Sequence, residues 1–390
     1  FCYPFQLFFN LIYYFFLDNF VLFFTRKEKE KNGIALIRTD AIGDLVLWLD
    51  SAKELRKLFS DKHITLICNG SVKELAIKFD YWDEIFPINL KKFSFNPFYR
   101  IKILRKIKKS SFEIAIQPTF SRTFISDYIV KVTNAPCRIG SAGDLSSISS
   151  LEKMISDKWY TTLIPAKKSL MMEIERNAEF LMGLGKINFI PNIAYIPKLD
   201  KIPEILESKN YFVIIPGAQW LGRCWPSYKF SEVINKISED TGFLPVICGN
   251  KKEMELCRKV MDNSKVNCIN LCGKTSLTQF VEIIRNAKFI IGNESSAIHI
   301  ATAVGTPSIC IMGGGHYGRF LPYPDYLKET GKKLPYIVVK QMDCFGCNWI
   351  CKFRLAKNDT VPCISSIEIE DVIKVYKKML EDNLKMKLLN

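Results

Sequence analysis

The sequence predicts a protein of the α/β class with two domains, each built around a parallel sheet. From residue 33 onward, apolar runs of strand length alternate with segments of helical periodicity. This alternation occurs twice, and a chain of 390 residues is long enough for two ordinary cores. We therefore expect an apolar N-terminal segment with a charged linker (1–32), an N-terminal domain (33–205) and a C-terminal domain (206–390).

The N-terminal domain begins with a predicted strand at Gly33–Thr39, followed by a turn at Asp40–Asp44. Helical periodicity then starts at Leu45. Asp44 therefore lies in the first turn of a helix that follows the carboxyl end of a strand. The helix dipole keeps a carboxylate ionised there, which suits a general base and equally suits a simple helix cap.

The C-terminal domain repeats the pattern. A predicted strand at Tyr211–Gly217 runs into a loop, and Pro226 opens the next helix. The segment LPVICGN is predicted to be the following strand, with a helix from about Glu253. Such β–α–β repetition is typical of a parallel sheet.

The segment 288–312 is the most informative stretch of the chain. It reads as a strand at Phe289–Ile291, a short helix opening at Ser295 or Ser296, and a strand at Ser308–Met312. Gly305 and the nearby Pro307 predict the end of the helix. The free N–H groups at the start of such a helix favour an anionic ligand, phosphate above all.

His299 lies one turn inside this predicted helix, within reach of the same ligand. A histidine on a short helix can equally be a packing residue with its hydrogen bonds satisfied. The sequence leaves both interpretations open.

Other phosphate-binding motifs are incomplete or absent. The segment from Gly217 to Gly222 resembles the start of a P-loop, but Arg223 and Cys224 replace the required Lys and Ser or Thr. No G-x-G-x-x-G follows the first strand, and there is no D-x-D pair to hold a metal-bound diphosphate. Cationic side chains and helix starts are therefore expected to neutralise a phosphate ligand.

The net charge of +15 is concentrated in part between Lys91 and Lys109, where eight Lys or Arg residues are interleaved with aromatic and aliphatic residues and no acid. This composition favours a membrane surface or an anionic acceptor, and no nucleic-acid motif accompanies it. A solvated helix face is the alternative.

Residues 1–24 are almost wholly apolar and strongly aromatic. The uncharged run of 17 residues that precedes Asp18 is short for a bilayer span and has no signal-peptide features. We interpret the segment as an interfacial anchor; a true span and a helix packed on the protein body are the alternatives.

Most of the 13 cysteines occur singly in apolar runs, as buried thiols in a reducing compartment do. Four late cysteines are different because their spacing, C-x2-C-x3-C-x11-C, can close around one structural Zn or Fe ion. Four reduced thiols in an irregular loop are the alternative. These residues are Cys344, Cys347, Cys351 and Cys363.

Several of these motifs together resemble one enzyme family. The segments IALIRTDAIGDLVLWLDSAKELRKLF, VIIPGAQWLGRCWPSYKFSEVI, VICGNKKEMEL and NLCGKTSLTQFVEIIRNAKFIIGNESSAIHIATAVGTPSICIMG are similar to the ADP-heptose:lipopolysaccharide heptosyltransferases, glycosyltransferase family 9. They occur in order across about residues 34–315. The resemblance implies two Rossmann-like domains facing a central cleft (the GT-B fold), inversion at the anomeric carbon, no required cofactor, and a donor held mainly by the C-terminal domain.

By the same resemblance, Asp44 matches the general base, Arg223 stands where the family has a phosphate-binding Lys, and Glu253 matches a ribose-binding carboxylate. The exchange of Lys for Arg keeps the charge but changes the geometry of binding. The family signature D-[ST]-G-x-x-H departs here at two positions, Glu for Asp and Ser for Gly, and the matching residues are Glu294, Ser295, Ser296 and His299.

Each of these residues has a simpler interpretation. Asp44 can be only a cap, Glu253 only an exposed helix acid, and Arg223 only a surface charge. Arg38, at the end of the first predicted strand, is a weaker candidate for binding an acceptor phosphate or carboxylate.

The sequence therefore predicts an inverting glycosyltransferase attached to the inner face of the cytoplasmic membrane. It would transfer heptose or a related sugar from an ADP-sugar to a lipopolysaccharide-type acceptor. A nucleotide-sugar epimerase of the same fold and a non-catalytic, membrane-tethered sugar-nucleotide-binding subunit are the alternatives.

Overall fold

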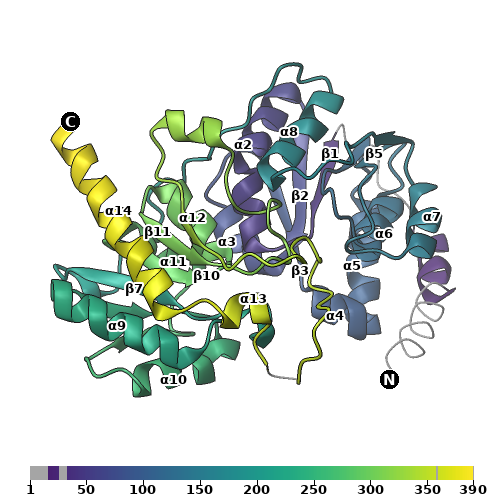
Figure 1. Cartoon of the computed structure of the whole chain (residues 1–390). Helices are drawn as coiled ribbons and strands as arrows, with labels where there is room; N and C mark the ends of the chain where they lie inside the picture. The colour runs from purple at the N-terminus through teal and green to yellow at the C-terminus, as the bar shows by residue number, and fades with distance from the viewer. Residues whose placement is uncertain (1–15, 26–32, 357–358, 390) are drawn as a thin grey trace. The chain divides into compact units, whose positions relative to one another are not determined.

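The computed structural model describes residues 16–25, 33–356 and 359–389, and the chain forms two compact units (Figure 1). Unit 1 extends to Ser169 and includes Ile174–Pro191. Unit 2 consists of Leu170–Glu173 and the chain from Asn192 onward. Each unit contains its own parallel six-stranded sheet, which confirms the predicted α/β class.

The sheet of unit 1 has the strand order β3-β2-β1-β4-β5-β6. Every residue of β1 is buried, and its apolar residues 33–37 are typical of a central strand with both faces covered. The strands are β1 (Gly33–Arg38), β2 (His63–Asn69), β3 (Glu84–Ile88), β4 (Ile114–Gln117), β5 (Cys137–Ser141) and β6 (Thr162–Ile164).

The helices of unit 1 connect these strands and include two that are strongly basic. Asn89 and Asn96 cap α4 and α5, because their side-chain oxygens accept the amides of Lys92 and Tyr99. The helices and 3₁₀ segment are α2 (Ile42–Leu58), η1 (Gly70–Val72), α3 (Lys73–Ala76), α4 (Leu90–Phe95), α5 (Pro97–Lys109), α6 (Phe124–Thr133), α7 (Ser150–Asp157) and α8 (Glu173–Gly183).

The described part of the N-terminal segment lies against α5. Residues 16–23 are helical, and the buried Asp18 carboxylate pairs with Arg100 at 2.6 Å. Four phenylalanines of the same segment are largely exposed, namely Phe16, Phe20, Phe23 and Phe24. Within the residues that the structure describes, no helix combines the length and apolarity needed to cross a membrane. Residues 1–15, on which much of the anchor prediction falls, lie outside that description.

The sheet of unit 2 has the order β12-β11-β10-β7-β8-β9. All residues of β7, β10 and β11 are buried, so these strands form its central part. The strands are β7 (Tyr211–Ile215), β8 (Leu244–Ile247), β9 (Ile269–Asn270), β10 (Ile290–Asn293), β11 (Ser308–Ile311) and β12 (Tyr336–Val338).

Helices cover this second sheet in two groups. Helix α9 packs against α10 and α14, whereas α11 packs against α12. The helices and 3₁₀ segments are η2 (Glu204–Leu206), η3 (Leu221–Arg223), α9 (Ser227–Thr241), η4 (Lys251–Glu253), α10 (Met254–Asp262), α11 (Leu277–Asn286), α12 (Ser296–Val304), η5 (Asp325–Thr330), α13 (Pro362–Ser365) and α14 (Ile369–Leu389).

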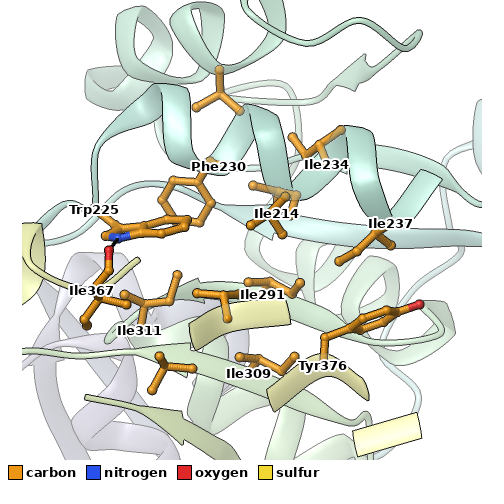
Figure 2. Close-up of a cluster of buried hydrophobic side chains, with 14 of the residues drawn as sticks. Ile214, Trp225, Phe230, Ile234, Ile237, Ile291, Ile309, Ile311, Ile367 and Tyr376 are labelled. Atoms are coloured by element: carbon orange, nitrogen blue, oxygen red, sulfur yellow. Dashed lines mark hydrogen bonds between the residues drawn. The ribbon is translucent and has the colours of Figure 1, made fainter. Parts of the chain in front are cut away.

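The core of unit 2 fixes the loop that follows β7. Figure 2 shows Trp225 and Phe230 packed among isoleucines of β7, β10 and β11. The indole N–H of Trp225 donates to the carbonyl of Ile367 at 2.9 Å. A buried Trp with its N–H satisfied holds its chain segment rigidly, and Arg223 lies only two residues earlier.

The predicted elements are confirmed with small shifts at their ends. The first helix begins at Ile42 and not at Leu45, because Asp44 accepts the Ala41 amide and thereby extends the helix start. Helix α12 ends at Gly305, which takes the left-handed conformation (φ 81°) that glycine adopts without steric cost.

Candidate functional site

Each sheet reverses its strand order at one point, and the candidate residues follow the strands on either side of it. In unit 1 this point lies between β1 and β4, and in unit 2 between β7 and β10. Ligands of open α/β sheets bind beyond the carboxyl ends of the strands at such points. The fold therefore places one candidate site in each unit.

In unit 1, Asp44 and Arg38 lie together at the end of β1. Asp44 is in the first turn of α2, where its Oδ2 accepts the Ala41 amide at 3.1 Å. The Arg38 guanidinium donates to the backbone carbonyl of Asp44 at 3.1 Å and pairs with Asp40 at 2.8 Å. Asp40 thus neutralises Arg38, while the Asp44 side chain is half-buried at the helix start.

Arg38 is almost fully buried, and part of its guanidinium makes no hydrogen bond to the described residues. Its guanidinium lies over the Trp48 ring at 4.9 Å, and neither Nε nor Nη1 has a hydrogen-bond partner among the described residues. Buried donors without partners are costly, so a ligand acceptor at this point would be stabilised. An anion-binding role for Arg38 stays a prediction.

In unit 2, Arg223 is held in place from three sides. Its Nη1 donates to Gln219 at 3.2 Å, its Nη2 pairs with Glu294 at 3.1 Å, and its guanidinium lies 4.3 Å from the centre of the Trp349 ring. The side chain is 8% exposed, so Arg223 is not an ordinary surface charge. Its Nε has no hydrogen-bond partner among the described residues.

Glu294 joins Arg223 to the start of α12. Burial raises the pKa of Glu294, and the neighbouring Arg223 opposes that rise. Ser295 is the N-cap of α12 but makes no capping hydrogen bond through its side chain, and its buried Oγ has no partner in the described part of the chain. Ser296 is the first residue of the helix. The helix start therefore offers amides and a hydroxyl to an anion beside the guanidinium.

His299 is buried one turn further along α12. Its Nδ1 lies 3.0 Å from the Tyr323 hydroxyl, and burial lowers the pKa of the imidazole to about 4. The ring is consequently neutral near pH 7. Any contact with a phosphate would have to be a neutral hydrogen bond and not an ion pair.

The Glu253 carboxyl group packs against two glycines, one in the loop after β7 and one in the loop after β8. A Cβ at Gly217 would come within 2.2 Å of the Glu253 carboxyl group, and a Cβ at Gly249 would come within 2.8 Å of it. Only glycine at both positions admits the carboxylate. Its Oε2 accepts the Asn250 amide at 2.7 Å, and burial raises its pKa. Glu253 and Arg223 therefore lie at the same edge of the unit 2 sheet.

Two residues that shape this edge were missed by sequence reasoning. Asn293 accepts the Trp225 amide at 3.0 Å and donates to the Pro216 carbonyl at 2.6 Å, so it ties the loop of Arg223 to β10. Trp349 reaches Arg223 from a distant segment. The buried amide of Asn293 could have been suspected from its place after an apolar strand, whereas no local signal indicates the role of Trp349.

The four late cysteines line one small cavity, together with Trp349 and apolar side chains. Burial raises the pKa of the Cys363 thiol, and the charges of the other three cysteines would raise it further. All 12 described cysteines are free thiols. Within the part of the chain that the structure describes, no three His, Cys, Asp or Glu side chains are grouped closely enough to hold a metal ion.

Comparison with known proteins identifies the family. The model of glycosyltransferase family 9 (heptosyltransferase) matches residues 100–344, which is more than half of the chain. The chain belongs to glycosyltransferase family 9. It is accordingly a glycosyltransferase, as the resemblance in the sequence predicted.

Curated relatives and solved structures extend the likeness over nearly the whole chain. Lipopolysaccharide heptosyltransferase 1 of Campylobacter coli is 22% identical over 374 residues, covering 90% of this chain and 99% of that protein. The structure of the ADP-heptose lipopolysaccharide heptosyltransferase II of E. coli has a TM-score of 0.64 at 16% identity, covering 90% of this chain and 99% of the other.

A third match concerns a metalloprotein. The iron-containing dodecameric glycosyltransferase TibC of enterotoxigenic E. coli H10407 has a TM-score of 0.53 at 15% identity, covering 92% of this chain and 78% of the other. At this identity the likeness shows a shared fold and does not transfer the iron.

Proposed function

We propose that this glycosyltransferase transfers heptose, or a related sugar, from an ADP-sugar to a lipopolysaccharide-type acceptor with inversion at the anomeric carbon. The observation that carries the proposal is the cluster at the β7/β10 edge, where Arg223 and the start of α12 lie together. A diphosphate needs such a combination of a guanidinium and free amides when no metal ion neutralises it. Heptose as the sugar and lipopolysaccharide as the acceptor class are inferred from the names of the related proteins.

The proposed reaction divides its chemistry between the two units. Asp44 takes the proton of the attacking acceptor hydroxyl, since a sugar hydroxyl is a poor nucleophile at neutral pH. Arg223 and the helix start at Ser295 and Ser296 stabilise the charge that develops on the leaving diphosphate. Glu253 binds the ribose hydroxyls, and Arg38 binds an anionic group of the acceptor.

A direct assay tests this proposal. Purified protein is incubated with ADP-heptose and a heptose-free lipopolysaccharide acceptor, with other nucleotide sugars in parallel, and the acceptor is analysed by mass spectrometry. We expect the acceptor to gain one sugar and ADP to be released. An altered donor without a glycosylated acceptor would indicate an epimerase. Donor binding without turnover on any acceptor would indicate a non-catalytic subunit.

We further propose that the protein attaches to the inner face of the cytoplasmic membrane. The exposed phenylalanines of residues 16–24 support this, because large aromatic side chains at a basic surface bind the lipid interface. Helix α5, which pairs with Asp18 through Arg100, supplies basic residues and leaves Phe98 84% exposed.

The attachment can be tested without disturbing the Asp18–Arg100 pair. Replacing Phe20 and Phe24 by Ser should shift the protein from the membrane pellet to the supernatant, because it removes apolar area from the lipid interface. Replacing the exposed Leu151 and Met154 by Ser in α7 is the matched control and should leave sedimentation unchanged. Equal sedimentation of both variants would contradict the proposal.

We also propose a structural Zn or Fe ion at the four late cysteines. Their common cavity supports it, although the thiols must move closer together to coordinate an ion. We expect elemental analysis of the purified protein to find about one equivalent of metal, since four thiolates complete a tetrahedral site. Cys344→Ser with Cys347→Ser should abolish it, and Cys137→Ser should not. Well under one equivalent in the unmodified protein would show four reduced thiols.

A further inference from the structure

The described residues of the segment 342–363 (342–356 and 359–363) pack directly on the glycine-rich loop that follows β11. The amides of Gly346 and Asn348 donate to the carbonyls of Gly314 and Gly315 at 2.7 and 2.9 Å. A Cβ at Gly315 would come within 2.3 Å of the Trp349 ring. The loop therefore lacks side chains at the point where the segment lies on it.

The same segment also contacts the turn that carries Arg223. The Val361 amide donates to the Gly222 carbonyl at 2.9 Å, and the Thr360 hydroxyl donates to the Cys224 carbonyl at 2.9 Å. These bonds lie on either side of Arg223. The segment thus fixes the backbone of the turn with its final residues and contacts the guanidinium with Trp349.

Trp349 adopts a conformation that its own backbone does not favour. Its φ is +63°, and that of Asn348 is +48°. For a bulky residue the left-handed region is disfavoured, and it persists only where surrounding contacts impose it. In this position Trp349 lines the cavity of the four cysteines, and the centre of its ring lies 4.3 Å from the Arg223 guanidinium carbon.

We propose that Trp349 is a positioning residue that holds the Arg223 guanidinium in place for the diphosphate of the donor. The inference rests on the proposed function of Arg223. A ring face beside a guanidinium attracts it and restricts its rotation. Gln219 and Glu294 hold the two terminal nitrogens at the edge of the guanidinium, and the Trp349 ring packs against the guanidinium itself.

A double-mutant cycle with ADP as the probe tests this role. Calorimetry measures the ADP affinity of the unmodified protein, Trp349→Ala, Arg223→Ala and the double variant. If Trp349 acts through Arg223, Trp349→Ala should weaken ADP binding about tenfold, and it should cause no further loss once Arg223 is absent. Trp349→Phe retains a ring and should recover most of the affinity. Ile350→Ala, an exposed neighbour, is the control.

Other results would contradict either the positioning role of Trp349 or the role of Arg223 in donor binding. Unchanged ADP affinity in Trp349→Ala, or losses that add in the double variant, would overturn the positioning role, since a general structural effect does not depend on Arg223. If Arg223→Ala itself binds ADP normally while Trp349→Ala does not, Arg223 is not the donor contact. That result would refute the proposed role of Arg223 separately from the coupling.

Discussion

Asp44→Asn is expected to lower kcat by about 10²–10⁴ while leaving folding and donor affinity nearly intact. The substitution removes the proton acceptor but keeps the shape of the side chain. Because an amide oxygen can still accept the Ala41 amide, the start of α2 should remain capped. Steady-state kinetics with saturating donor and acceptor would measure the loss, and thermal unfolding would verify the fold.

Asp40 is the rival base in the same loop, and the structure separates the two residues. Asp40 forms an ion pair with Arg38 at 2.8 Å and accepts a hydrogen bond from the Thr119 hydroxyl at 3.4 Å, so it has a structural role. Asp40→Asn should therefore reduce thermal stability more than turnover. The exposed Asp61→Asn is the control. Near-normal turnover in Asp44→Asn with an inactive, folded Asp40→Asn would assign the base to Asp40.

The arrangement of strands and helices followed closely from local signals in the sequence. Pro226 marks the start of α9, because its ring restricts the backbone angles. Gly305 marks the end of α12, because glycine adopts left-handed backbone angles that other residues avoid. The apolar run NCINLCG, residues 267–273, also has the composition of a strand, but only Ile269–Asn270 pairs as β9 at the sheet edge. Apolar content alone does not determine how far an edge strand pairs.

The sequence predicted where the candidate site lies, namely beyond the ends of strands, but not how its residues pair. Arg223, Glu253 and Glu294 could be assigned to loops beyond β7, β8 and β10 because a parallel sheet brings those loops to one edge. Their pairing could not be predicted, since the Arg223–Glu294 ion pair and the Trp349 contact join segments far apart in the chain. For His299, burial and its bond to Tyr323 depend on tertiary packing.

These contacts change what each residue can do. Arg223, taken from the sequence as a phosphate ligand or a surface charge, is a nearly buried guanidinium whose charge is partly offset by Glu294. Glu294 therefore sets how strongly Arg223 attracts an anion. This chain departs from the family signature at that position, so the departure adjoins the proposed donor site.

Arg223→Ala is expected to weaken ADP binding about tenfold to a hundredfold, because it removes a charge-assisted contact to the diphosphate. It should also lower kcat, since the same guanidinium stabilises the leaving group as charge develops. Arg223→Lys keeps the charge but loses the forked geometry, so an intermediate affinity is expected. Glu253→Ala should weaken binding through the ribose without the same loss of kcat. Calorimetry with ADP and steady-state kinetics measure both quantities.

The experiment with Arg223→Ala must separate a loss of ADP affinity from a loss of protein stability. Removing Arg223 leaves the buried Glu294 carboxylate without its partner, which disfavours the folded state unless that group takes up a proton. Arg223→Ala with Glu294→Gln removes this charge and should restore stability but not ADP affinity. Arg285→Ala breaks a partly buried ion pair of unit 2, with the buried Glu282, and should destabilise the protein without weakening ADP binding. Unchanged ADP affinity in both Arg223→Ala and Glu253→Ala would show that the β7/β10 edge does not bind the donor.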